Sequence, residues 1–144
     1  MTHIELSLSH LEPVAAHPLI TWSAPIPSAE ESCLVIDAAG LIVAASAPWA
    51  RLVEAARPSE LKGLHVLDSS VLCLIDFTAA GKELGEAERE QIPPLLALTS
   101  KRLARGLMRV RTDDGAGSRT IDAVASPLWH GGTVVGSLSF FADV

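Results

Sequence analysis

The chain has 144 residues, of which 49% are hydrophobic and 19% are charged, with a formal net charge of −6. This balance excludes a disordered chain and indicates one globular domain that buries roughly two-thirds of its unfolded surface. The acidic charge argues against direct contact with nucleic acid, because phosphate binding requires a basic surface. No apolar run approaches the ~20 residues of a membrane span, and no secretory signal is recognisable. We therefore expect a cytoplasmic protein that contacts neither nucleic acid nor membrane.

Residues 1–30 form a segment of different character, which we expect to be an N-terminal arm. Residues 4–8 alternate apolar and polar side chains, which predicts a short half-buried strand. From Pro13 onward, repeated prolines disfavour a long helix and favour an extended conformation. The arm also carries apolar side chains that a solvated tail would not need: Leu19, Ile20, Trp22 and Ile26. We expect this arm to pack on the body of the domain or on a second copy.

A hairpin that leads into a helix is predicted over residues 33–56. The apolar runs 33–36 and 41–45 are separated by Asp37-Ala38-Ala39-Gly40, where Asp favours turn entry and Gly accepts a positive φ. Ser46 can cap the helix, and Pro48 fits its first turn. Trp49 then opens an apolar face with helical spacing, which places it in the core.

The middle of the chain is predicted to contain turns and two or more helices. Residues 71–75 are apolar and fit either a buried strand or a short buried helix. Residues 86–90 are acidic and helix-forming, and a second helix begins at Pro93 and Pro94 and ends at Gly106.

The last third is predicted to be an antiparallel meander. Strands are expected at residues 107–111, 119–128 and 133–141, joined by turns at 113–117 and 130–132. The order is therefore two strands, helices, then three strands. This order predicts an α+β fold in which a five-stranded antiparallel sheet carries the helices on one face.

Four short motifs in this order resemble the PAS family of sensory and dimerisation modules. They are a first hairpin at residues 34–42, Glu60-Leu61-Lys62-Gly63, Asp113-Asp114-Gly115, and a closing strand pair that contains Pro127-Leu128 and Val135-Gly136-Ser137-Leu138. The resemblance covers residues 31–143, so the expected organisation is an arm at 1–30 and a PAS-like domain at 31–144. Many family members carry Asn just before the first helix, where this chain has Ala45-Ser46, so the resemblance adds nothing about a ligand.

The resemblance implies a cavity between the sheet and the helices, which in the family holds haem, flavin, a metabolite or nothing. Candidate cavity residues are Leu95, Leu96, Thr99, Ile36 and Val43. Neither Cys33 nor Cys73 lies in the Asn-Cys-Arg-Phe-Leu-like helix motif of the flavin photoreceptors. The predicted helix at 92–105 contains no histidine for haem, and His65 is the one candidate elsewhere in the helical layer. The sequence therefore supports neither cofactor, and any cofactor stays unknown.

The closing strand is apolar on both faces, and a strand of this kind is covered on both faces. One face belongs to the core, and the other requires the arm or a second protomer. The resemblance also implies dimerisation through the outer face of the sheet. The candidate interface residues are Leu19, Trp22, Trp129, Val135 and Phe141.

Two other clusters have a simple structural interpretation. The histidines at positions 3, 10 and 17 are seven residues apart, but Pro13 interrupts any helix that would align them, so no metal site is predicted. The five basic residues between 101 and 111 are interpreted as cations near a helix end plus a solvated strand face. The alternative for this basic cluster is a contact with an acidic patch on a partner protein.

These patterns predict a regulatory domain without enzymatic activity. It would act as the homodimeric input domain of a signalling or transcription regulator, coupled to an effector domain or partner protein, and the resemblance allows it a small ligand. A ligand-free assembly or adaptor module is the alternative. A small enzyme with a cysteine nucleophile is a second alternative, which is disfavoured because aliphatic surroundings raise thiol pKa values.

Overall fold

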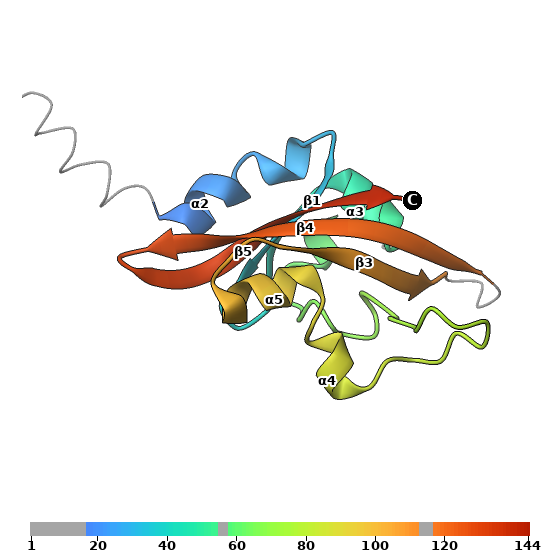
Figure 1. The fold of residues 1–144 in the computed structure, drawn as a ribbon. Coiled ribbons are helices and arrows are strands. Elements are labelled where there is room, and N and C mark those ends of the chain that lie inside the picture. The colour runs from blue at the N-terminus through green and yellow to red at the C-terminus, as the bar shows by residue number, and fades with distance from the viewer. Residues whose placement is uncertain (1–16, 55–57, 113–116) are drawn as a thin grey trace, which may run out of the picture.

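The computed structural model describes residues 17–54, 58–112 and 117–144, and its centre is one antiparallel sheet (Figure 1). The strands are β1 (Ser32–Asp37), β2 (Ile42–Ala45), β3 (Ala104–Arg111), β4 (Ser118–His130) and β5 (Thr133–Asp143). They lie in the order β2-β1-β5-β4-β3, so the first hairpin sits beside the last strand. The α+β architecture expected from the sequence is confirmed.

Short helices cover both faces of this sheet. They are α2 (Pro18–Ser23), α3 (Ala47–Leu52), α4 (Glu86–Arg89) and α5 (Pro93–Ser100), with single 3-10 turns η1 (Ile26–Ser28) and η2 (Pro58–Glu60). Figure 1 shows α2 on one side of the sheet and α4 and α5 on the other. We call the α5 side the inner face and the α2 side the outer face. Within the described ranges, no helix is long and apolar enough to cross a membrane.

Part of the expected extended arm is helical. Pro18 occupies the first position of α2, where its missing N–H costs nothing, and the His17 Nδ1 accepts a hydrogen bond from the Leu19 amide at 3.2 Å. Pro18 was among the prolines expected to prevent a long helix, and it instead starts a short helix. Leu19 packs on the outer face against a cluster that includes Cys33, Val35 and Leu138. The strand predicted at residues 4–8 lies outside the described residues.

The main core lies between the inner face and the helices. Trp49 is 1% exposed, as the helical spacing predicted, and its ring centroid lies 5.8 Å from that of Phe141. Alternate residues of β1, such as Leu34 and Ile36, fill this core, while Cys33 and Val35 face α2. The domain thus has one large cluster inside and one smaller cluster outside the sheet.

Ser46 joins the start of the domain to its first helix. Its fully buried hydroxyl accepts hydrogen bonds from the Trp49 amide at 3.3 Å and the Cys33 amide at 2.9 Å. It also donates to the Glu31 carbonyl at 2.7 Å. The predicted cap is confirmed, and it additionally holds the chain that enters β1.

The end of α5 differs from the sequence prediction. The helix stops at Ser100, because Lys101 adopts a left-handed conformation (φ 59°) and its amide bonds to the Ala97 carbonyl. β3 then starts at Ala104, so Gly106 is a strand residue and not a helix end. Residues 113–116 of the turn predicted at 113–117 lie outside the described residues.

Irregular segments pair with both edges of the sheet. The segment 63–66 lies along β2: the Ile42 amide donates to the Leu64 carbonyl, and the Gly63 amide donates to the Ile42 carbonyl, both at 2.8 Å. The segment 73–75, which the sequence left between strand and helix, forms a single bridge with β3 through Leu74 and Val110. Each segment therefore covers part of its edge of the sheet.

Candidate functional site

A cleft of about 530 Å³ opens beside the β1–β2 turn, and four segments of the chain meet there. The turn contributes residues 38–40, and the segment after η2 contributes His65 and Leu67. The remaining wall consists of α4 and α5 residues: Glu86, Arg89, Glu90, Leu95, Leu98 and Thr99. The volume lies within the 300–1,000 Å³ range of small-molecule sites.

The β1–β2 turn has a fixed shape because Asp37 holds it from inside. The Asp37 Oδ1 accepts hydrogen bonds from the Ala39 and Leu41 amides, each at 2.9 Å. Gly40 has φ +84°, which a residue with a side chain adopts only at a cost. The turn therefore presents a rigid backbone wall to the cleft.

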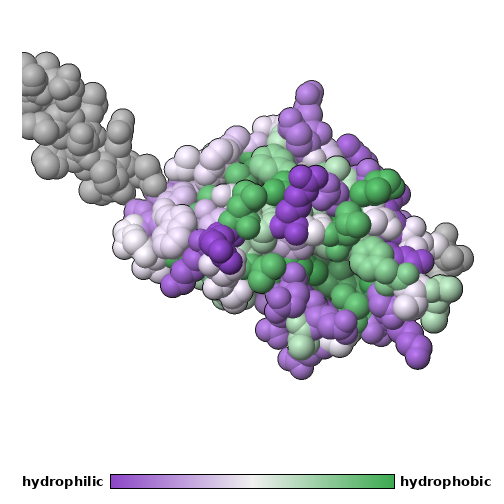
Figure 2. Space-filling model, viewed as in Figure 1, coloured by the Kyte–Doolittle hydropathy of each residue, from purple (hydrophilic) through white to green (hydrophobic). Residues whose placement is uncertain are grey.

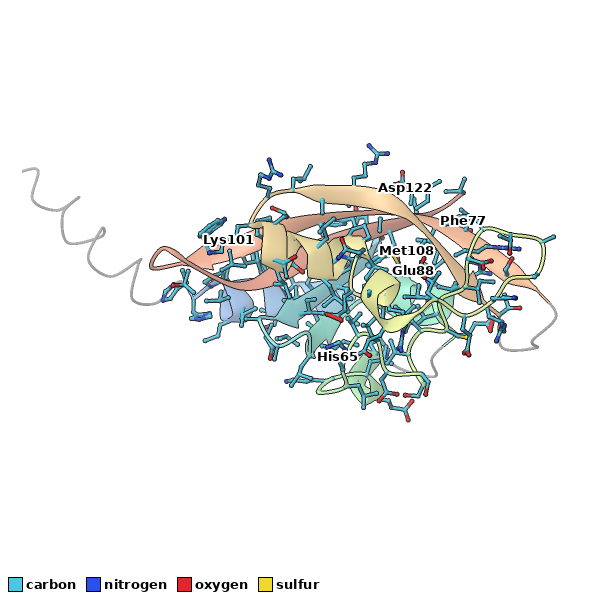
Figure 3. All side chains as sticks on the ribbon, turned by 60° about the horizontal axis from the view of Figure 1, so that its bottom comes forward. His65, Phe77, Glu88, Lys101, Met108 and Asp122 are labelled. Carbon is cyan, nitrogen blue, oxygen red and sulfur yellow. The ribbon has the colours of Figure 1, made fainter. Side chains whose placement is uncertain are left out.

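His65, which is labelled in Figure 3, lies against that wall. Its Nδ1 accepts a hydrogen bond from the Leu67 amide at 3.0 Å, so the neutral ring carries its proton on Nε2. A Cβ added to Gly40 would lie 2.5 Å from Nε2, which shows how closely the ring approaches the glycine. Because Gly40 has no side chain, the His65 ring can occupy the space beside it.

The helical wall combines polar and apolar groups. The Arg89 guanidinium donates to the Leu67 carbonyl, which ties α4 to the same loop. The sheet holds α5 in place, because the buried Ser137 hydroxyl of β5 donates to the Pro94 carbonyl at 2.9 Å. Leu95 and Thr99 follow on α5 at a spacing of four and both reach the cleft. The cleft thus offers hydrogen-bonding groups around an aliphatic wall.

The five predicted cavity residues fall in four places. Leu95 and Thr99 line the cleft together. Leu96 packs with the small residues of α5, β3 and β4, and Ile36 is fully buried in the main core. Val43 lies by the outer cluster and lines a different hollow, of about 230 Å³. The sequence did not anticipate His65, Arg89 or the β1–β2 turn as walls, because loops bring them there without any periodic pattern.

The predicted interface residues are likewise divided. Trp22 and Trp129 are 40% and 49% exposed, so both rings are available to a partner. Leu19 and Val135 are half-buried in the outer cluster. Phe141 is buried in the main core against Trp49, where it stabilises the domain itself.

Comparisons with known proteins follow the same architecture. No family model and no curated protein sequence matches the chain. Among solved structures, a PAS domain from Colwellia psychrerythraea aligns with a TM-score of 0.59 and 17% identity, covering 88% of this chain and 96% of that one. Vibrio cholerae VqmA, described as a dimer among LuxR-type receptors, aligns at 0.60 and 14%, covering 87% of this chain and 51% of that one. A Rhodobacter sphaeroides LOV protein aligns at 0.60 and 13%, covering 85% and 64%.

The chain has a PAS fold. These identities show the fold alone, and the chain spans about half the length of VqmA.

The cysteines of this PAS domain do not fit the flavin photochemistry of the LOV type. Cys33 faces α2 on the outer side of the sheet, away from the cleft. Burial raises the pKa of its thiol, although the Ser46 hydrogen bond partly opposes the shift. Burial also raises the pKa of Cys73, and its contact with Glu83 adds to that rise. Neither free thiol therefore combines the position and the thiolate character that such a reaction needs.

The histidines offer no ligand set for haem or another metal in the part of the PAS domain that is described. The His65 Nδ1 accepts a hydrogen bond from the Leu67 amide, and the Nε2 side of the ring lies closely packed against Gly40. His17 stacks on His130 with ring centroids 4.5 Å apart, and positions 3 and 10 lie outside the described residues. Among described residues, no group of three or more His, Cys, Asp or Glu could hold a metal ion.

Proposed function

We propose that this chain is the PAS input domain of a signalling or transcription regulator, that it acts as a homodimer, and that it binds a small molecule in the cleft beside the β1–β2 turn. The observation that carries the ligand proposal is the meeting of four segments around 530 Å³. The fold of its structural neighbours supports the assignment as an input domain.

The walls of the cleft favour a small, partly polar ligand. Leu67, Leu95 and Leu98 provide apolar surface, while Thr99 offers a hydroxyl group. Glu86 and Glu90 accompany the single Arg89, so the cleft does not favour a strongly anionic ligand. A molecule with an aliphatic body and one or two neutral hydrogen-bonding groups matches this lining.

Native mass spectrometry of the purified chain, followed by thermal shift against a metabolite mixture, tests the ligand proposal. We expect a bound mass or a stabilising compound for the natural chain. Thr99→Trp fills the cleft from an exposed position and should abolish both signals. Thr133→Trp makes the same change at an exposed site on β5 and should leave them intact. An unliganded mass without any stabilising compound would instead favour the ligand-free assembly module.

Exposed apolar side chains on α2 support the homodimer. Ile20 and Trp22 are 68% and 40% exposed, and Phe140 is 40% exposed on the part of the outer face that α2 leaves uncovered. Aromatic residues of this kind are enriched in protein interfaces. A second copy would bury both sets.

Light scattering tests this assembly. The natural chain should be a dimer at micromolar concentration, and Ile20→Asp with Trp22→Asp should convert it to a monomer. Phe141→Asp is unsuitable because it would disrupt the core around Trp49. Lys62→Asp, an exposed change by β2, serves as the control for added negative charge. A natural chain that is monomeric at that concentration would refute the dimer.

A regulatory role without catalysis completes the proposal. The raised pKa values of Cys33 and Cys73 disfavour a cysteine nucleophile at neutral pH. The two free thiols are in keeping with the reducing conditions of the cytoplasm, where we place the protein. The effector would be a further domain or a separate partner. Turnover of any substrate that Cys33→Ala or Cys73→Ala abolishes would overturn this part.

A further inference from the structure

One half of the β3 edge is already occupied by the chain itself. The Ile75 amide donates to the Arg109 carbonyl, and the Arg111 amide donates to the Cys73 carbonyl, both at 2.9 Å. After Ile75 the chain turns away from β3, and residues 82–84 pair with residues 74–76 and not with β3. Ile75 forms a bridge with Glu83, and the Leu84 amide donates to the Leu74 carbonyl at 3.1 Å. This arrangement ends the pairing at the middle of β3.

The other half of the same edge has open backbone groups. Main-chain groups alternate in direction along a strand, so Arg105 and Leu107 point their N–H and C=O to the same side as Arg109. Among described residues, no backbone group bonds to Arg105 or Leu107 on that side. An open strand edge of this kind is a template for a further strand.

A groove runs along this open stretch and is lined by apolar side chains. It encloses about 360 Å³ between β3, the loop that contains Phe77, and the start of α5. Phe77 and Leu107 are 59% and 56% exposed at its rim. Figure 2 shows apolar side chains gathered below β3 and bordered by hydrophilic ones. The floor consists of Leu74, Leu84, Ile92, Pro93 and Met108.

The two ends of the groove differ in charge. Lys101 and Arg102 precede β3, are exposed, and have no side-chain partner in the described part of the chain. Arg105 is paired with Asp122 at 2.7 Å, so it adds little free charge. Glu88 lies on the α4 wall toward the other end, and Figure 3 places Met108 and Glu88 between Lys101 and Phe77. Lys101 and Arg102 therefore offer unengaged positive charge at the end where β3 begins, whereas the Arg109 guanidinium at the other end donates to the Asp76 and Thr78 carbonyls.

We propose that the β3 edge binds an extended segment of a partner protein by strand addition, antiparallel to β3, with apolar residues beside Phe77 and Leu107 and acidic residues beside Lys101 and Arg102. The segment takes the place that the chain leaves free after Ile75. Backbone hydrogen bonds supply affinity in this mode, and the two ends of the groove supply specificity. This site is separate from the ligand cleft and from α2.

Charge argues against a second copy of this chain as the occupant. Residues 101–111 contain five of the 11 Lys and Arg residues and no Asp or Glu. An antiparallel β3–β3 pair would place Lys101 and Arg102 of one copy beside Arg109 and Arg111 of the other. Like charges placed opposite one another are unfavourable, whereas an acidic segment neutralises them.

A synthetic peptide with this pattern tests the proposal. The probe is an acetylated and amidated Val-Thr-Val-Thr-Val-Glu-Glu, added to the full chain while binding is followed by calorimetry and by backbone amide NMR. We expect saturable binding, together with slower hydrogen exchange of the Arg105 and Leu107 amides. Two control peptides are matched: one has lysines for glutamates, and the other has alternate amides methylated on the edge-facing side. Both should bind about tenfold more weakly or not at all.

Variants of the chain separate charge from backbone pairing. Lys101→Glu with Arg102→Glu should weaken the probe about tenfold, whereas Lys62→Glu, on the far edge, should not. Leu107→Pro removes one outward N–H without touching the ladder to β4, and Leu107→Val keeps that N–H. The Lys101/Arg102 and Leu107 variants should leave ligand binding in the cleft and the α2-dependent dimer unchanged. A failure of strand addition can therefore be distinguished from a failure of the proposed function.

Several results would overturn the proposal. One is absence of probe binding, and another is equal binding of the methylated peptide. A third is self-association of the chain that Leu107→Pro abolishes and that the probe peptide fails to displace. In that case a second copy, and not an acidic partner segment, would occupy the β3 edge.

Discussion

Ser137 and Ser139 lie two residues apart on the inner face of β5, both fully buried, yet only Ser137 has a side-chain hydrogen bond among the described residues. Its hydroxyl donates to the Pro94 carbonyl, whereas the Ser139 Oγ has no partner. Burying a hydroxyl without a partner costs free energy, and a satisfied one contributes modestly. The two serines therefore provide a matched comparison within one strand.

Alanine substitution should affect these two serines in opposite directions. Ser137→Ala should lower the free energy of unfolding by about 1 kcal/mol, because the link between β5 and α5 is lost. Ser139→Ala should raise it by about 1 kcal/mol, because it removes an unsatisfied polar atom. Urea denaturation measures both, with unchanged m-values as the check on the two-state assumption. Equal destabilisation by the two substitutions would show that Ser139 has a partner.

Gly40 and Gly63 permit a similar comparison for the cleft. Both have left-handed backbones, with φ of +84° and +87°, but only Gly40 has His65 in the space that a Cβ would occupy. Gly63→Ala should cost roughly 1 kcal/mol from backbone strain. Gly40→Ala should cost more and displace the imidazole, which a shift of the His65 ring resonances would reveal.

A double-mutant cycle isolates the contact between Gly40 and His65. In a His65→Ala background, Gly40→Ala should cost no more than Gly63→Ala does, because the clash is gone. If the full cost of Gly40→Ala persists in that background, the turn itself and not the ring limits the substitution.

Ser46 should be the most sensitive polar residue of the first hairpin. Ser46→Ala removes the cap of α3 and leaves the Cys33 amide and the Glu31 carbonyl without this partner. We expect a loss of about 2 kcal/mol or more in the free energy of unfolding. Ser28, whose exposed hydroxyl donates to the Pro25 carbonyl, provides the control. Ser28→Ala should change stability by less than about 0.5 kcal/mol.

The thiols should be protected from alkylation in the folded state. The pKa of Cys33 and that of Cys73 are both raised, chiefly by burial, so the thiolate fraction at about pH 8 is below that of the unfolded chain. Iodoacetamide labelling followed by mass spectrometry should modify half-buried Cys73 first and Cys33 only on unfolding.

The same shifts predict a loss of stability at alkaline pH. Because the folded state retains these protons more strongly, stability is constant below the ordinary thiol pKa and falls as pH rises through the raised values. The double variant Cys33→Ala with Cys73→Ala should therefore lose less stability at alkaline pH in urea denaturation. In the labelling experiment, faster modification of Cys33 than of Cys73 would contradict the deeper burial of Cys33.

The fold was predictable because its local signals agree with one another. Asp37 and Gly40 mark the first turn, Ser46 caps α3, and positive φ at Gly131 and Gly132 forms the β4–β5 turn. Strand faces also follow from the period of two, as Leu34 and Val35 show. The boundary between α5 and β3 was predicted too late, because Lys101, and not a glycine, adopts the left-handed terminating conformation.

The candidate site was only partly predictable. Leu95 and Thr99 follow from helical spacing and reach the cleft. His65 and Arg89 reach it through hydrogen bonds to the irregular stretch around Leu67, which leave no periodic trace in the sequence. Cleft walls formed by loops depend on tertiary contacts, and propensity and periodicity do not encode these contacts.

The Ser46 hydroxyl connects the outer layer of the domain to its core. After α2 and η1, the chain reaches β1 just past Glu31. The Ser46 hydroxyl donates to the Glu31 carbonyl and accepts from the Cys33 amide, on either side of Ser32, and it also accepts from the Trp49 amide in the first turn of α3. The residue that caps α3 is therefore also the residue that ties the segment after η1 to the helix of Trp49. In the proposed dimer through α2, the interface and the centre of the core would be joined by the hydrogen bonds of a single side chain.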